Sequence, residues 1–395
     1  MWNKEKYNLA LKGVLTYAHR NSYQGYNKYD ALDSKLLSAL SFGNRYLRLL
    51  YSQAVMRFPV NIRPLLLVPQ TRNPKGIALF ALAYMHRYRA YNDIKDLEQA
   101  EVLLDWLLAN PSKGYKGICW GYQHPWQDVG FFAPAHLPNR IVTYFVDSAL
   151  LDAYELTRNM KYLDAASDSV NFLLDEPRIL FESEDMKALS YVPDNNVNWI
   201  VMDVSILAGS ILSRINKHKP DLRLAAESRK LVHFVIDKMT DYGAWYYTHP
   251  AGDHPRQHDN YHTGYILDAI LDYSDHSENK EFMDAYFKGL EYYKQQLFRH
   301  DGAPKWANNR TYPLDVHGSA QGIITFVKAA RFDKQHLDFS VKVADWAIDN
   351  MQHPGHGFFY YQKTKFFRKP FTLMRWSCGW MARALGCLAE SLSSN

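Results

Sequence analysis

Cysteine is scarce in this sequence of 395 residues, which contains only Cys119, Cys378 and Cys387 and no Cys-x-x-Cys pair. Three cysteines cannot all pair, so no disulfide framework is expected and a reducing compartment is favoured. The first residues, Met1-Trp-Asn-Lys-Glu-Lys, lack the apolar core of a secretory signal. No stretch reaches the roughly 18 apolar residues that cross a membrane. We therefore expect a soluble, cytoplasmic protein with no membrane span.

The sequence also lacks runs of charge of one sign. Its formal net charge is +5, and no Lys/Arg cluster predicts a nucleic-acid partner. The mild basic excess favours a polyanion such as a uronate polymer. The signatures of bound cofactors are missing as well, because there is no phosphate-binding loop, no GxGxxG and no HExxH. We predict no cofactor and no bound metal.

Aromatic residues, by contrast, are abundant. They make up 15% of the chain, with 28 Tyr and 10 Trp, while hydrophobic residues make up 47% and charged residues 22%. This composition predicts a large folded core and argues against disorder. The aromatic excess fits a cleft in which flat side chains stack on sugar rings. It also fits rings that merely fill wide gaps between helices, and both interpretations stay open.

Apolar helical segments begin roughly every 60 residues, which is the spacing of a repeat built from helical hairpins. The six segments start at Asn73, Asn139, Asn198, Asn260, Asp315 and Met374. More amphipathic helices, such as Leu97–Leu108 and Phe282–Leu297, lie between them. Alternating apolar and amphipathic helices are what nested inner and outer rings require.

The repeat predicts an all-α protein, a single (α/α)6 toroid over residues 1–395. Residues 1–34 are expected to form an N-terminal helical extension packed on it. Residues 35–58 are expected to provide the outer partner of the first inner helix.

The two kinds of connection differ in length. Outer-to-inner connections are long and carry aromatics, often after a glycine, as at Gly117, Gly243, Gly302 and Gly357. Their alternating patterns predict short β-hairpins. Inner-to-outer connections, such as Arg89–Asp93, are short. We therefore expect one decorated face, and loops on a rigid scaffold make that face the candidate site.

Candidate catalytic residues cluster at two consecutive inner-helix starts. The first cluster holds Asp259, Tyr261 and His262, and the second holds Asp315 and His317. Histidine and tyrosine can move protons. Each aspartate has an alternative role as a helix N-cap, which accepts a bond from a backbone N–H. We expect both histidines to line the same cavity as both aspartates.

Candidate substrate-binding residues surround these clusters. Arginine can hold a carboxylate at two points, amides and carboxylates can bind hydroxyls, and tryptophan can stack on a sugar. Helix-end salt bridges and turn formation are the structural alternatives. The candidates are Trp120, Asn139, Arg140, Asp194, Asn196, Trp245, His258, Trp306, Gln321, Arg375 and Trp376.

Three motifs carry a resemblance to known proteins: Asp259-Asn-Tyr-His-Thr-Gly-Tyr, Asp315-Val-His-Gly-Ser-Ala-Gln and Met374-Arg-Trp-Ser-Cys-Gly-Trp. Together they resemble proteins of bacterial surface-polysaccharide biosynthesis. Over about residues 35–392 the chain is similar to the six-hairpin glycosidase superfamily, which includes unsaturated-uronyl hydrolases, N-acylglucosamine epimerases and toroid polysaccharide lyases. The C-terminal domains of glucuronyl C5-epimerases are similar in plan. The resemblance implies the fold and leaves the reaction open, because one toroid hosts several chemistries.

Three functions compete for an acidic poly- or oligosaccharide substrate. A glycoside hydrolase needs two carboxyl groups, for which Asp259 and Asp315 are the first candidates and Asp194 the third. A uronyl C5-epimerase or lyase needs a base, an acid and a cation, which His262, Tyr261, His317, Arg140 and Arg375 provide. A non-catalytic glycan-binding protein needs only aromatics and amides. The hydrolase is the first choice, and the sequence indicates no oligomeric state.

Overall fold

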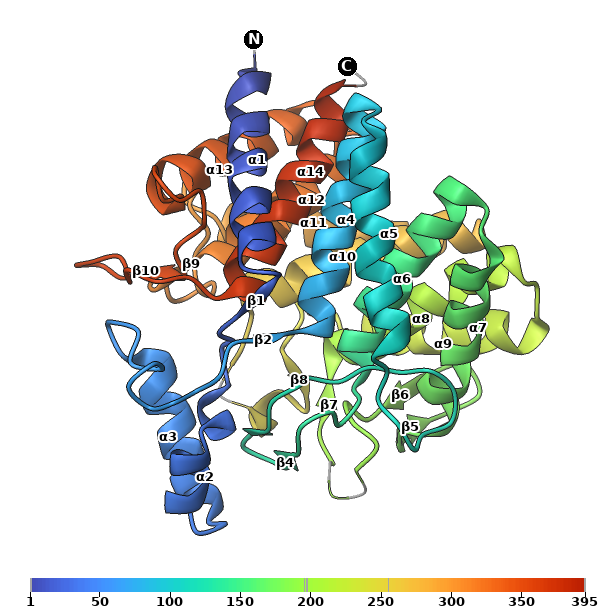
Figure 1. Ribbon diagram of the computed structural model, residues 1–395. Coiled ribbons are helices and arrows are strands. Elements are labelled where there is room, and N and C mark those ends of the chain that lie inside the picture. Colours follow the sequence, from blue (N-terminus) through green and yellow to red (C-terminus); the bar gives the residue numbers. More distant parts are fainter. Residues whose placement is uncertain (1, 195, 197, 255, 394–395) are drawn as a thin grey trace.

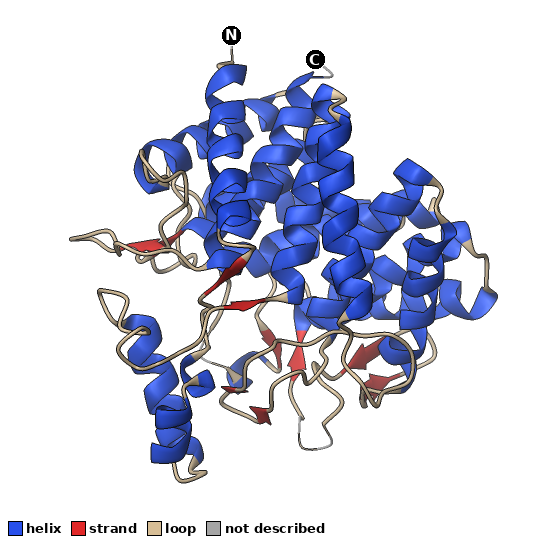
Figure 2. Ribbon diagram, viewed as in Figure 1, coloured by secondary structure: helices blue, strands red, loops and turns tan. Residues whose placement is uncertain are grey.

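An inner ring of helices forms the centre of the molecule. The computed structural model describes residues 1–395 except 1, 195, 197, 255, 394 and 395. Within the described part, six inner helices each pack against the next, and the last returns to the first (Figures 1 and 2). In chain order they are α4 (Pro74–Tyr91), α6 (Arg140–Thr157), α8 (Met202–His218), α10 (Asn260–Ser277), α12 (Val316–Ala329) and α14 (Trp380–Ser393). The predicted (α/α)6 toroid is thereby confirmed.

An outer ring surrounds the inner one. Each outer helix packs on an inner neighbour: α5 (Ile94–Ala109), α7 (Met160–Asp175), α9 (Leu222–Asp237), α11 (Met283–Gln296) and α13 (Gln335–Met351) follow their partners in sequence. α1 (Lys4–Arg20), from the start of the chain, packs on α14. The outer position beside α14 is thus filled by α1, which joins the two ends of the chain.

Residues 35–58 do not provide an outer helix for α4, contrary to the sequence interpretation. They form α2 (Lys35–Leu40) and α3 (Arg45–Arg57), which pack with the short helix η1 (Ala31–Asp33) and lie beside the strand-bearing face (Figure 1). α3 buries only Ser52 and Val55, too narrow an apolar face to cover an inner helix. α1 buries six positions at helical spacing and is suited to that role.

The helices of the two rings differ in how many of their faces are buried. α4 is buried at every residue from Pro74 to Met85, as expected for a helix with neighbours on all sides. α9 is buried at Leu224, Ser228, Leu231 and Val232 but exposed or only partly buried at the positions between them, which is one stripe of an amphipathic helix. The alternation seen in the sequence is therefore the alternation of the rings.

The inner helices all begin at one face, where short antiparallel strands gather (Figures 1 and 2). The paired strands are β1 (Gln24–Gly25) with β2 (Thr71–Arg72), β3 (Trp126–Gln127) with β4 (Phe132–Ala133), β5 (Ile179–Glu182) with β6 (Lys187–Leu189), β7 (Ile200–Val201) with β8 (Thr248–His249), and β9 (Leu314–Asp315) with β10 (Gln362–Lys363). A short helix, η2 (Ala251–Asp253), follows β8.

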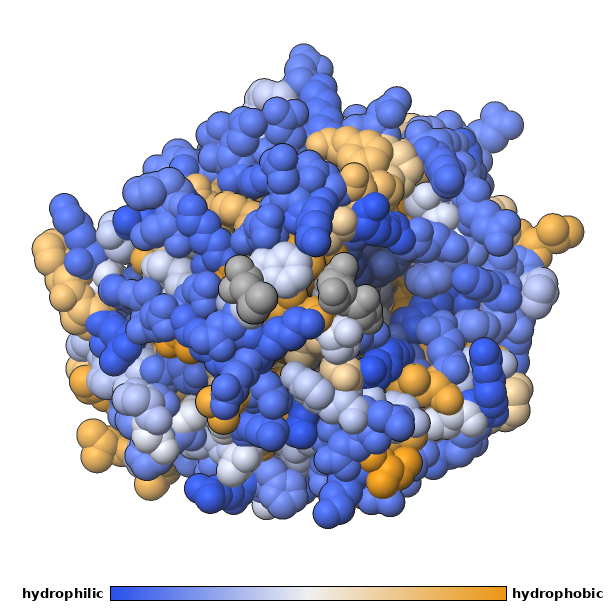
Figure 3. All heavy atoms as spheres, turned by 90° about the horizontal axis from the view of Figure 1, so that it is seen from above, coloured by the Kyte–Doolittle hydropathy of each residue, from blue (hydrophilic) through white to orange (hydrophobic). Residues whose placement is uncertain are grey.

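The opposite face is plain. There Asn92 and Arg158 end α4 and α6 in left-handed conformations, and the outer helices begin within two residues. Both termini lie on this side (Figure 1), and its surface is mostly hydrophilic (Figure 3). The asymmetry predicted from connection lengths is confirmed. None of the helices in the described ranges is long and apolar enough to cross a bilayer.

Candidate functional site at the inner-helix starts

The candidate site is built mainly from one position of the repeat, the second residue after the N-cap of each inner helix. Across the described inner-helix starts, this position is polar or titratable in five repeats and apolar, as Ile141, in the remaining one. The five residues are Lys75, Asp203, Tyr261, His317 and Arg375. Arg375 lies in the π-helix η3 (Met374–Gly379), which continues into α14. The ring geometry therefore places a set of charged and proton-moving side chains at one face.

His262 is held by a carboxylate on its own helix. Its Nδ1 lies 2.7 Å from Asp259 Oδ2, and its backbone N–H also donates to Asp259. Arg256 Nη1 lies 3.1 Å from the same carboxylate oxygen and donates to the Tyr261 hydroxyl at 2.7 Å. Burial by itself would raise the pKa of Asp259, but the neighbouring His262 and Arg256 lower it below its ordinary value. Asp259 is thus both the N-cap and the partner of the imidazole.

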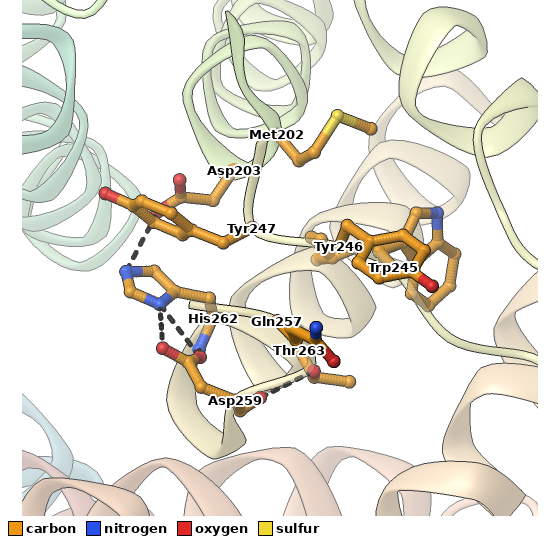
Figure 4. Close-up of a pocket in the computed structure, with 10 residues that line it drawn as sticks. Met202, Asp203, Trp245, Tyr246, Tyr247, Gln257, Asp259, His262 and Thr263 are labelled. Atoms are coloured by element: carbon orange, nitrogen blue, oxygen red, sulfur yellow. Dashed lines mark hydrogen bonds and ion pairs between the residues drawn. The ribbon is translucent and has the colours of Figure 1, made fainter. Parts of the chain in front are cut away.

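The other nitrogen of His262 faces a second carboxylate across a small cavity. His262 Nε2 lies 4.0 Å from Asp203 Oδ2, and the His262 side chain stays 14% exposed. The cavity has a volume of about 10 Å³, room for about one water molecule, and Figure 4 shows His262 between Asp203 and Asp259. Burial raises the pKa of Asp203 although His262 opposes the shift. The two carboxyl groups around His262 therefore have pKa values shifted in opposite directions.

His317 sits in an aromatic box instead of the cavity. Its ring stacks between Tyr261 and Trp380 at centroid distances of 4.4 Å and meets Trp376 edge-on. Its Nε2 is 2.8 Å from the Tyr265 hydroxyl, and its Nδ1 has no hydrogen-bond partner among the described residues. Burial, followed by the nearby lysines and Arg375, lowers the pKa of His317 well below its usual value. It is a neutral imidazole at neutral pH.

The Asp315 carboxylate accepts hydrogen bonds from three donors. They are the His317 backbone N–H, Trp376 Nε1 at 2.8 Å and Gln362 Nε2 at 2.9 Å. The expectation that both histidines and both aspartates share one cavity therefore fails for this pair. Asp315 and His317 are buried and do not line the cavity beside His262, because Asp315 turns toward Trp376 and Gln362.

Four residues predicted to bind substrate use their polar atoms in bonds within the fold. Trp120 is fully buried and donates from Nε1 to the Leu107 carbonyl. Asn139 caps α6, Arg140 donates to the Leu173 and Ser190 carbonyls, and Gln321 donates to Asp268 deep in the inner ring. Their polar atoms satisfy buried backbone and core groups, which the linear sequence does not reveal.

The remaining predicted residues lie on loops and in η3, at the face where the inner helices begin. Trp245 donates from Nε1 to the Val235 carbonyl and lines the cavity beside His262. His258 Nδ1 donates to the Trp245 carbonyl, and its Nε2 lies 2.9 Å from the Tyr242 hydroxyl. Asp194 accepts from Asn196 on an outlying loop. Trp306, Arg375 and Trp376 lie together with Lys28, whose Nζ is 3.7 Å from the Trp376 ring centre and 5.4 Å from that of Trp306. Arg375 packs over Trp376 at 5.3 Å.

Sequence reasoning missed four charged residues of the site: Lys28, Lys75, Asp203 and Arg256. Lys75 and Asp203 could have been found by applying the N-cap+2 register to every repeat. Lys28 and Arg256 come from loops, between β1 and η1 and between η2 and α10 respectively, where no periodic signal marks them. In the described ranges no three His, Cys, Asp or Glu side chains gather as metal ligands.

Comparison with known proteins defines the architectural class. No protein-family model and no curated protein sequence matches the chain. Among solved structures, cellobiose 2-epimerase from Bacillus thermoamylovorans has a TM-score of 0.62 at 14% identity, over 82% of this chain and 90% of that one. A GH76 α-mannanase from Bacteroides thetaiotaomicron has 0.61 at 13% identity, over 82% and 86%. An unsaturated glucuronyl hydrolase specific for heparin has 0.59 at 11% identity, over 82% and 87%.

These similarities establish the fold. The chain is an (α/α)6 toroid of the glycosidase-like architecture, as the sequence motifs implied. The structures that share it include an epimerase and two glycan hydrolases, so the same scaffold carries different reactions.

Proposed function

We propose that the chain is an enzyme that acts on a sugar by moving a proton at a carbon next to a carbonyl group, the chemistry of epimerases, isomerases and lyases. The observation that carries this proposal is the imidazole of His262, whose Nδ1 pairs with Asp259 while Nε2 faces the cavity and Asp203. A carboxylate on one ring nitrogen fixes the tautomer and leaves the other nitrogen as a base.

The proposed step uses residues already in place. Nε2 of His262 takes the proton from the carbon as the C–H bond breaks, and the electron pair moves into an enolate on the carbonyl oxygen. Asp203, with its raised pKa, is a suitable proton donor to the enolate. The guanidinium of Arg375 stabilises the developing anion, and Lys75, whose pKa burial lowers well below its ordinary value, adds a charge when it is protonated.

A sugar ring is far larger than the present cavity of about 10 Å³. We propose that the residues lining the cavity move apart to admit the sugar and close again, which excludes water from the proton transfer. Two of the structurally similar proteins, cellobiose 2-epimerase and D-mannose isomerase, are named for reactions of this class, which supports the proposal.

Glycoside hydrolysis is the second candidate, and one observation favours it. Asp203 and Asp259 have pKa values shifted up and down respectively, which is the pattern of an acid and a base on neighbouring carboxyls. The pair first expected from the sequence, Asp259 with Asp315, is less suited because Asp315 already accepts three hydrogen bonds.

Incubation of the protein in D₂O with a panel of neutral and uronate-containing mono- and oligosaccharides separates these reactions. We expect deuterium at the carbon beside the carbonyl group, with no new reducing ends, and loss of the exchange in His262→Gln. An unsaturated product would identify the lyase form of the same chemistry. New reducing ends without exchange would replace the proposal by hydrolysis.

A further inference from the structure

Three buried cations surround the aromatic box and form no ion pair. Within the described residues Lys28, Lys75 and Arg375 have no carboxylate within salt-bridge distance, although each is at most 4% exposed. Lys28 Nζ and Arg375 Nε have no hydrogen-bond partner there either. Lys75 Nζ reaches only the Tyr265 hydroxyl, at 3.5 Å.

Other buried cations near the same face are satisfied. Arg63 pairs with Asp30 at 2.7 Å and donates to the Asn27 carbonyl. Lys369, 5% exposed, donates to the Met56 carbonyl at 2.9 Å. A buried cation without a partner is costly because it has lost its hydration. The three unpaired groups are therefore exceptions: burial lowers the pKa of both lysines, and an anion bound beside them would restore their charge.

The three groups lie around one set of aromatic rings, with Lys75 Nζ 5.2 Å from the Trp380 ring centre. Lys28 Nζ lies over Trp376 and Arg375 packs over the same ring, at 3.7 and 5.3 Å from its centre. Trp376 meets His317 at 4.5 Å, and Lys75, Lys28 and Arg375 all act on the pKa of His317. An anionic group bound here lies beside the aromatic rings on which its sugar would stack.

The charge on Lys28 itself depends on its surroundings. Burial is the main cause that lowers the pKa of Lys28 to about 7; Asp315 and Asp259 oppose the shift, and Arg256 and Arg375 add to it. The uncharged rings of Tyr29, Trp306 and Tyr361 complete its surroundings. An anion bound nearby would raise the pKa of Lys28, so that the lysine takes up a proton on binding.

We infer that Lys28, Lys75 and Arg375 form an anion subsite for a carboxylate or phosphate on the sugar, and that Lys28, which comes from outside the ring, determines specificity for it. The inference rests on the proposed function in that it names the substrate class of the same site. The Asp30–Arg63 ion pair holds the segment that carries Lys28 in place, so the position of the lysine is fixed by neighbouring contacts.

A matched pair of sugars tests the subsite by binding alone. Cellobiouronic acid and cellobiose differ only in one carboxylate, while glucose 6-phosphate and inorganic phosphate report the phosphate source. By titration calorimetry at pH 6 we expect the wild type to prefer the anionic member of a pair. Lys28→Met should weaken anion binding about tenfold or more, the usual size for loss of a charged hydrogen bond, and leave cellobiose unchanged. Lys369→Met, which removes a satisfied buried lysine, should change neither.

Either of two results would overturn the inference: no preference for an anionic sugar or phosphate by the wild type, or equal loss of neutral and anionic binding in Lys28→Met. Stronger binding of cellobiouronic acid than of glucose 6-phosphate identifies a carboxylate ligand, and the reverse identifies a phosphate.

The pH dependence gives a second readout if Lys28→Met folds poorly. Below pH 7 Lys28 is protonated before the anion binds, and above it the complex must take up a proton. Anion affinity of the wild type should therefore fall as pH rises from 6 to 8.5. Lys28→Arg, which stays charged, should bind the anion with a shallower dependence on pH than the wild type, the remainder coming from Lys75, whose pKa burial also lowers well below its ordinary value. An unchanged pH profile would contradict the assignment.

His262→Gln separates this inference from the proposed reaction. It should abolish deuterium exchange but keep anion binding within about twofold of the wild type, since His262 is not one of the three cations. Loss of exchange with intact anion binding therefore supports both statements independently, while anion binding without any exchange in the wild type removes only the reaction.

Discussion

The two histidine clusters begin with the same local pattern and end in different environments. In each, an aspartate caps an inner helix and a histidine follows in the first turn. His262 is three residues after its cap, and its imidazole meets the cap carboxylate at 2.7 Å. His317 is two residues after its cap, and Asp315 binds its backbone while the side chain turns into the aromatic box.

One residue of spacing explains the difference, because each residue rotates a helix by about 100°. At three residues the capping oxygen and the imidazole lie on the same side of the helix. At two residues the imidazole points elsewhere, and the carboxylate is free to accept from Trp376 and Gln362. The comparison teaches that a capping aspartate becomes the partner of a base only at the longer spacing. The following variants test this difference.

Replacing His262 should have the largest effect. His262→Gln removes the only imidazole paired with a carboxylate in the first turn of a described inner helix, and loss of a general base typically costs 10²–10⁴-fold. The measurement is the rate of deuterium exchange into the best substrate of the panel. Activity within threefold of the wild type would show that His262 is not the base.

The two capping aspartates should separate activity from stability. Asn can still cap a helix, so Asp259→Asn keeps the cap but loses the charge that orients His262, and we expect about a 100-fold loss of activity per folded molecule. Asp315→Asn keeps its cap as well, and activity should stay within about tenfold.

Stability provides the complementary measurement for Asp315→Asn. Its three charge-assisted hydrogen bonds become neutral, which should lower the free energy of unfolding by about 1–3 kcal/mol. Urea unfolding of both variants gives this value. Equal loss of activity in the two variants would show that the clusters do not differ as proposed.

The neutral His317 should make the protein sensitive to acid. Its pKa is lower in the folded protein than in the unfolded chain, where it is about 6.5. Its contribution is therefore fully present above pH 6.5 and is lost as pH falls, at about 1.4 kcal/mol per pH unit. His124 and His254, whose pKa values are lowered to about 3 and about 4 by burial, act in the same direction, so the variant difference is the measurement.

His317→Phe removes the titrating group from this comparison. Urea unfolding between pH 5 and 6.5 should show a shallower acid slope for the variant than for the wild type. Equal slopes would mean that His317 is protonated in the folded protein or does not contribute.

The smallest effect is expected at Tyr265. Tyr265→Phe keeps the ring against Trp380 but removes the hydroxyl that bonds His317 Nε2 at 2.8 Å. Loss of one buried hydrogen bond should cost about 1 kcal/mol of unfolding free energy. The imidazole NMR signals of His317 should shift while those of His262 stay in place, and a shift of both would show that the clusters are coupled.

Much of the fold could be predicted from the sequence, because the repeat of apolar segments reports burial directly. The same pattern also pointed to the first turns in which Tyr261, His262, His317 and Arg375 lie, although not to which of them share a cavity. It could not show that Trp120, Arg140 and Gln321 bond to buried backbone and core groups. Nor could it place Lys28, which reaches Trp376 from a loop far away in sequence.

Local sequence patterns were enough to predict the ring, the face at which the inner helices begin and the residue types gathered there. Helix periodicity and capping are local properties, encoded within a few turns of chain. The folded structure was needed to show which aspartate pairs with an imidazole, which histidine is fully buried and which cationic side chains have no ion-pair partner among the described residues. These properties depend on distances between segments far apart in the chain, because desolvation and charge interactions are set by what lies within a few ångströms in space.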